Sequence, residues 1–104
     1  MDFHRLSTWA IVCEEMLDTT RPRVYFERAR EELRRRTISS ETYLEMRRLA
    51  WLTEGWLNYQ EMLWDWNSLD EKDILRAIEW QFAEGWIDQT ERENWIAFAR
   101  RFID

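Results

Sequence analysis

The chain has 104 residues, which is enough for one domain, residues 1–104, with a hydrophobic core of its own. A single cysteine excludes an internal disulfide, and one proline and two glycines favour helices with short connections over sheet or disorder. The apolar runs are short and no basic segment precedes an apolar one at the N-terminus, so we expect no signal peptide, no membrane span and a cytoplasmic protein.

Charge is distributed unevenly along the chain, around a net value of −6. Residues 21–48 contain nine Arg and five Glu, whereas residues 49–104 contain twelve acidic and five basic side chains. Long-range electrostatic attraction therefore favours a partner with a basic surface for the C-terminal half.

Helical spacing of the apolar residues predicts six helices. Asp2 is suited to cap the first helix, which should end near Leu17, and Pro22 lies in the first turn of the second, which should end near Arg36. The third begins at the N-cap Ser39, and the others cover 59–67, 68 or 70 to 84, and 89–102. Short connections imply antiparallel neighbours, so we predict an all-α compact bundle.

The segment 43–66 is predicted to lie at the centre of this bundle. Apolar side chains occupy all sides of its first helical turns, which is typical of an enclosed helix. The segment also holds four of the eight tryptophans.

A four-residue pattern occurs twice, at 55–58 and at 85–88: glycine, tryptophan, a branched apolar residue and an N-capping residue. Each glycine should end a helix in the left-handed conformation, with the tryptophan folded back as a lid. At the first copy, we expect Trp56 to lie against Trp51. Glu follows each capping residue by three positions, which predicts two capping boxes and two corners of helical hairpins.

Catalytic and metal-binding patterns are missing from the sequence. His4 is the only histidine, and no nucleophile accompanies it in a recognisable arrangement. Zinc spacing, a glycine-rich phosphate loop and a calcium loop are also missing, and a di-iron bundle needs more than one histidine. We therefore expect a protein that is not an enzyme and needs neither cofactor nor metal.

The segment 21–36 is rich in arginine and is the one candidate for contact with nucleic acid, through Arg34, Arg35 and Arg36, with Tyr25 or Phe26 as a stacking plane. The alternative is a solvated helix with ion pairs four residues apart, namely Arg23–Glu27, Arg28–Glu32, Glu31–Arg35 and Glu32–Arg36. The net negative charge favours this alternative, so we do not expect direct binding of nucleic acid.

Two tryptophans depart from the apolar stripes of their helices. Trp64 falls on the side opposite the inward residues, and Trp80 lies among charged residues. Exposed tryptophan surrounded by acids is typical of a binding hot spot, whereas the alternative is burial in a seam of the bundle or a dimer contact. The acids near these tryptophans form either an ordinary solvated face or a surface that imitates nucleic-acid phosphates. The predicted partner-binding residues are Glu61, Trp64, Asp65, Asp70, Glu71, Asp73 and Trp80.

With Trp64, Trp80 and the acids at 65–73, the chain resembles small phage-encoded inhibitors of bacterial defence, anti-CRISPR proteins in particular, in size, acidity and surplus aromatic residues. We expect a monomer or homodimer, and the resemblance implies a location in the cytoplasm of a bacterial host. It further implies stoichiometric binding to a nuclease or CRISPR effector, with DNA entry or nuclease recruitment blocked. The alternatives are a structural or adaptor subunit of a homo- or hetero-oligomer, and a nucleic-acid-binding accessory that uses Arg34–Arg36.

Overall fold

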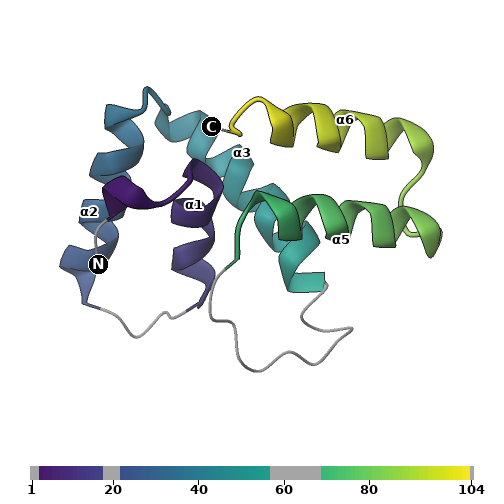
Figure 1. Ribbon diagram of the computed structural model, residues 1–104, viewed down its shortest axis with the longest axis horizontal. Coiled ribbons are helices and arrows are strands. Elements are labelled where there is room, and N and C mark those ends of the chain that lie inside the picture. The colour runs from purple at the N-terminus through teal and green to yellow at the C-terminus, as the bar shows by residue number, and fades with distance from the viewer. Residues whose placement is uncertain (1–2, 18–21, 57–68, 104) are drawn as a thin grey trace.

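The computed structural model describes residues 3–17, 22–56 and 69–103 (Figure 1). Within these ranges the chain is helical and contains no strand, which confirms the predicted all-α class. The elements are η1 (Phe3–Arg5), α1 (Thr8–Leu17), α2 (Arg23–Arg35), α3 (Ser40–Ala50), η2 (Trp51–Gly55), α5 (Glu71–Ala83) and α6 (Gln89–Arg100). The predicted helix 59–67 lies outside the described residues. No described helix has the length and apolar character needed to cross a membrane.

The helices form two groups joined by α3 (Figure 1). On one side, α1 packs against α2 and α3. On the other, α5 and α6 form an antiparallel hairpin, and η2, which continues α3, packs against α5. Because α3 and η2 contact both groups, they connect the N-terminal helices to the C-terminal hairpin.

The most enclosed helix is α1. Its side chains from Thr8 to Glu14 are buried except for the partly buried Ala10. The prediction that segment 43–66 is the enclosed centre is wrong for its described part, because Leu44 is 59% exposed and Leu52 is also exposed. The physical reason is charge: α3 carries four charged residues and needs a solvated face, whereas α1 carries only two.

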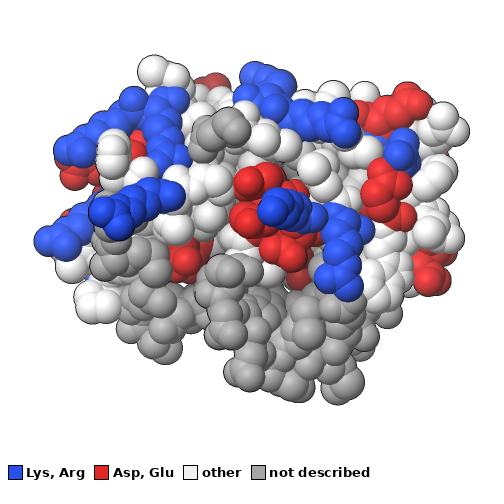
Figure 2. All heavy atoms as spheres, in the orientation of Figure 1, with Lys and Arg blue, Asp and Glu red and all other residues white. Residues whose placement is uncertain are grey.

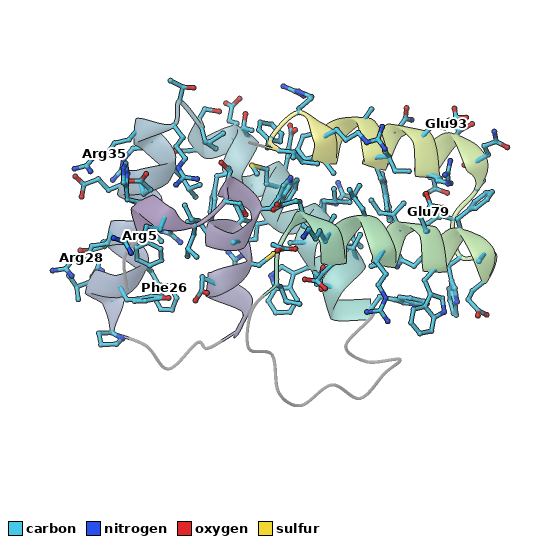
Figure 3. The ribbon with its side chains drawn as sticks, viewed as in Figure 1. Arg5, Phe26, Arg28, Arg35, Glu79 and Glu93 are labelled. Carbon is cyan, nitrogen blue, oxygen red and sulfur yellow. The ribbon has the colours of Figure 1, made fainter. Side chains whose placement is uncertain are left out.

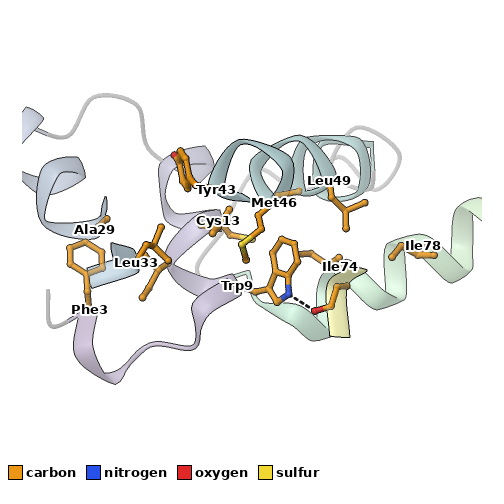
Figure 4. Close-up of a cluster of buried hydrophobic side chains, with 14 of the residues drawn as sticks. Phe3, Trp9, Cys13, Ala29, Leu33, Tyr43, Met46, Leu49, Ile74 and Ile78 are labelled. Carbon is orange, nitrogen blue, oxygen red and sulfur yellow. Dashed lines mark hydrogen bonds between the residues drawn. The ribbon is translucent and has the colours of Figure 1, made fainter. Parts of the chain in front are cut away.

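Trp9 joins the two ends of the chain inside the core (Figure 4). Its indole Nε1–H donates a hydrogen bond of 2.8 Å to the carbonyl oxygen of Ala99 in α6. Its ring also meets Phe98 and Phe102 edge to face, at centroid distances of 6.3 and 6.2 Å. The buried indole is therefore satisfied in both its apolar and its polar requirements.

Most helix starts follow the predicted local rules. Ser39 accepts a hydrogen bond from the backbone N–H of Thr42 and caps α3, and Asp88 and Glu91 form the predicted capping box of α6. The first helix is different: Ser7 accepts from the N–H of Ala10, so the cap of α1 is Ser7, and a separate 3₁₀ turn precedes it.

The two glycines behave differently. Gly85 has φ of 78° and ends α5, as predicted. Gly55 lies within the π-helical turn η2, and the helix continues into Trp56, so the corner predicted there is wrong. Thr53 gives the reason, because its hydroxyl donates to the carbonyl oxygen of Leu49 at 2.8 Å and competes with the regular backbone ladder. Trp56 packs on Trp80 instead of Trp51.

Candidate functional site

The predicted acidic patch is only partly covered by the structure, since Glu61, Trp64 and Asp65 lie outside the described residues. Its other three acids surround the start of α5, where acidic side chains gather in Figure 2. Asp70 and Asp73 form a capping box: Asp70 accepts from the N–H of Lys72, and Asp73 accepts from the N–H of Asp70 at 3.1 Å. Glu71 accepts a hydrogen bond of 2.8 Å from the hydroxyl of Ser7. These acids therefore have roles within the chain, and their contact with a partner stays a prediction.

Trp80 is partly buried and lies in the seam between η2 and α5. Its ring meets Trp56 edge to face at 6.0 Å, and the guanidinium of Arg76 lies 5.7 Å from its centroid. These contacts favour a packing role for Trp80 over that of an exposed hot spot.

A buried carboxyl group lies in the same seam. Glu54 is 1% exposed, and its Oε1 has no hydrogen-bond partner within the described structure. Burial, together with the negative charges of Asp73 and Asp70, raises the pKa of Glu54 from 4.5 to about 8, although Arg76 opposes the shift. The raised pKa favours the protonated, neutral form of Glu54 at pH 7.

Two further buried polar atoms in this seam have no partner among the described residues, the indole nitrogen of Trp56 and the Oε1 of Gln81. The other end of the Gln81 amide donates to the carbonyl oxygen of Leu52 at 2.8 Å. In α1, burial and the nearby acids raise the pKa of the Cys13 thiol. Across the described ranges, no three His, Cys, Asp or Glu side chains lie close enough together to hold a metal ion.

The corner between α5 and α6, residues 79–88, has a defined backbone conformation at the end of α5. The N–H of Gly85 donates to the carbonyl oxygen of Phe82, and the N–H of Trp86 donates to that of Gln81 at 2.9 Å. These two bonds, with the left-handed Gly85 between them, form a Schellman motif. Trp86 nevertheless projects into solvent, with 65% of its surface exposed.

Trp86 was predicted to be a lid, and this prediction is wrong. In a Schellman motif the residue in the position of Trp86 usually contacts an apolar residue on the last turn. Here that position holds Gln81, which is buried and turned toward η2. The polar residue at position 81 was the signal in the sequence that the lid contact would be missing.

The corner is acidic as well as aromatic. Residues 79–88 contain three acids and no basic residue. The nearest arginine in α6, Arg92, is already paired with Glu79 through two bonds of 2.6 and 3.1 Å, and its guanidinium lies over the ring of Phe82. Figure 3 shows Glu79 on α5, on the side of the hairpin that faces α6. Phe82 remains exposed beside it. The corner thus presents an exposed tryptophan within a negatively charged surface.

A groove of about 320 Å³ separates α3 from α6. Four apolar and three charged side chains line it. The apolar residues are Leu49, Leu52, Trp95 and Phe98, and the charged ones are Glu45, Arg48 and Glu91.

The arginine-rich helix α2 carries ion pairs between residues four apart, two of them exposed and the third, Arg36–Glu32, with a buried carboxylate. Three of the four predicted pairs are present, Arg23–Glu27, Arg35–Glu31 and Arg36–Glu32, at 3.0, 3.3 and 3.2 Å. Burial alone would raise the pKa of Glu32, but the hydrogen bond and charge of Arg36 outweigh it and lower that pKa.

Arg36 has a second role that the sequence did not indicate. Its guanidinium donates to the hydroxyl of Thr8 and to the backbone carbonyls of Phe3 and His4, at 3.2, 3.2 and 3.3 Å. It therefore ties the end of α2 to η1 and α1. Tyr25, proposed as a stacking plane, donates its hydroxyl to Glu14 and packs on Phe3 instead.

Comparison with known protein families, with characterised proteins and with solved structures finds no match to this chain.

Proposed function

We propose that the protein acts by binding another protein, through the acidic, tryptophan-bearing corner between α5 and α6. The observation that carries the proposal is the exposure of Trp86 on a backbone fixed by the Schellman motif. Tryptophan is enriched among the residues that dominate interface energy, and a rigid anchor loses little conformational entropy when it is buried.

The charge of the corner specifies the chemistry of the partner. Glu84 and Asp88 flank Trp86 in sequence and both are exposed, so a basic surface is the complementary one. Proteins that bind DNA present such surfaces. The proposed activity is therefore stoichiometric inhibition of a nuclease or a CRISPR effector in the cytoplasm of a bacterial host, in keeping with the resemblance to phage-encoded inhibitors.

Affinity capture from a lysate of the host bacterium tests this proposal. The bait is the tagged protein, compared with Trp86→Ala and with the control Val24→Ala, which removes an exposed apolar side chain from α2. The expected result is retention of a DNA-cleaving protein or complex by the wild type and the control only, with release at high salt because exposed charges are screened. Inhibition of its cleavage activity by the purified chain must accompany capture.

Retention of the same complex by Trp86→Ala, or capture without inhibition, would refute the proposal.

The second candidate function, a structural or adaptor subunit, is supported by a different surface, the exposed apolar side chains of α3 and η2 beside the α3–α6 groove.

A further inference from the structure

The outward side of α3 and η2, here called the α3 face, carries three exposed apolar side chains among its charged ones. Leu44 is 59% exposed, and Trp51 and Leu52 are exposed as well. Because residues three, four and seven apart share a side of a helix, these side chains lie beside the open edge of the α3–α6 groove. Isolated exposed apolar residues are ordinary, but several of them on one side of a helix, next to an apolar groove, are typical of an interface.

Charges on the α3 face are arranged by sign along the helix. Glu41 and Glu45 lie in the N-terminal half of α3, and Arg47 and Arg48 lie in the C-terminal half. The side chains of Glu45 and Arg48 make no hydrogen bond or ion pair with another residue that the structure describes. A helix of this kind is complementary to a copy of itself that runs in the opposite direction.

We propose that a second copy of this chain docks on the α3 face, with the two α3 helices antiparallel about a twofold axis that passes between Met46 and Arg47. In this arrangement, Glu45 of each copy faces Arg48 of the other, so that two ion pairs form. Such a contact is isologous, since the same patch is used on both copies, and it closes as a dimer.

The apolar residues fit the same axis. Leu44 of each copy lies opposite Leu49 of the other and enters its groove, whose floor is completed by Leu52, Trp95 and Phe98. The groove, at about 320 Å³, has room for a few side chains. Antiparallel packing also places the N-terminus of each helix dipole beside the C-terminus of the other, which is the favourable orientation.

The proposed dimer does not depend on the proposed function, because it uses α3 and the groove and leaves Trp86 and residues 79–88 outside the contact. Failure of one proposal therefore leaves the other unaffected. Trp86→Ala should keep the dimer, and a variant of the α3 face should keep the corner.

Charge-reversal variants analysed by sedimentation equilibrium test the dimer. Glu45→Arg places a positive charge opposite Arg48 of the second copy, and Arg48→Glu places a negative charge opposite Glu45. Each variant alone should therefore have a dimer dissociation constant about tenfold or more above that of the wild type. The matched control is Arg28→Glu, the same reversal at an exposed position of α2, which should remain dimeric. Circular dichroism checks that each variant is folded.

Two combinations make the test specific to the proposed axis. An equimolar mixture of the Glu45→Arg and Arg48→Glu chains should form a heterodimer, because both cross-axis pairs become attractive again. The double variant carrying both reversals in one chain should recover the homodimer. A wild type that is monomeric across the micromolar range would overturn the proposal. A dimeric wild type whose reversal variants are unaffected, or cannot be rescued by mixing, would also overturn it and place the contact elsewhere.

Discussion

Replacement of the buried Glu54 by glutamine should remove a large part of the pH dependence of folding. Glutamine has almost the same volume and cannot ionise. The groups facing Glu54 are Asp70, Asp73 and Arg76, which shift its pKa, and Cys13 of α1, whose own thiol pKa is raised in part by Glu54. Because these neighbours are present in both proteins, the difference between wild type and variant reports the ionisation of Glu54 together with its electrostatic coupling to them.

The magnitude follows from the two pKa values. The carboxyl loses its proton near pH 4.5 in the unfolded chain and near pH 8 in the folded protein. Between these values the folded state binds more protons, so the free energy of unfolding falls as pH rises, by at most about 1.4 kcal/mol per pH unit. The stabilisation is complete below pH 4.5, and an upper bound of roughly 5 kcal/mol is lost by pH 8.

Urea unfolding followed by circular dichroism between pH 4 and pH 9 measures this effect. The free energy of unfolding of Glu54→Gln, relative to wild type, should rise by roughly 3–5 kcal/mol between pH 4.5 and 8. The control Glu84→Gln removes an exposed carboxyl at the end of α5 and should give a profile parallel to the wild type. A parallel profile for Glu54→Gln as well would refute the conclusion that this carboxyl is buried and neutral.

Three comparisons test the fold by thermal and urea unfolding. Gly85→Ala should destabilise the protein by about 1 kcal/mol, since φ is 78° there. Gly55→Ala lies in a helical turn, where its Cβ would meet the partly exposed ring of Trp51 at 3.3 Å, so it should cost less than Gly85→Ala; equal losses would contradict the assigned conformations. Arg36→Ala should lower the free energy of unfolding by about 2–3 kcal/mol because it leaves backbone carbonyls unpaired. Arg35→Ala, at an exposed position, should lower it by less than about 0.5 kcal/mol, and similar losses for the two variants would refute the anchoring role of Arg36. Trp9→Phe should cost roughly 2–4 kcal/mol through the lost hydrogen bond and a cavity, and a cost below 1 would show that the bond contributes little.

Features that depend on a few adjacent residues were predictable from the sequence. The caps at Ser39 and Asp88 and the left-handed Gly85 were each predicted from short patterns, because the chemistry of a helix end is local. The all-α class was predicted from helical periodicity in the same way.

Features decided by packing were not predictable. The sequence at Gly55 matches that at Gly85, yet the helix continues there, because the hydroxyl of Thr53 and the packing of η2 on α5 favour a π-helical turn. Likewise, the enclosure of α1 depends on which helices surround it, and the anchoring role of Arg36 depends on where η1 lies.

Part of the predicted site, Glu61, Trp64 and Asp65, lies outside the described residues, so that site stays a prediction. Within the described ranges, Trp86 is exposed beside acidic residues, whereas the predicted Trp80 is partly covered by Trp56 and Arg76. Periodicity places a residue on one side of a helix, but only the neighbouring helices determine whether that side is covered.

The central claim is that Trp86 anchors a protein partner. The most direct test is an equilibrium titration of the captured partner with the wild type, Trp86→Ala and Val24→Ala. Isothermal calorimetry should give one-to-one binding that Trp86→Ala weakens by roughly 30- to 700-fold, equivalent to about 2–4 kcal/mol. The affinity of Val24→Ala should be within about threefold of the wild-type affinity. Both variants should unfold at the same temperature as the wild type, since both side chains are exposed. Unchanged affinity of Trp86→Ala would contradict the account.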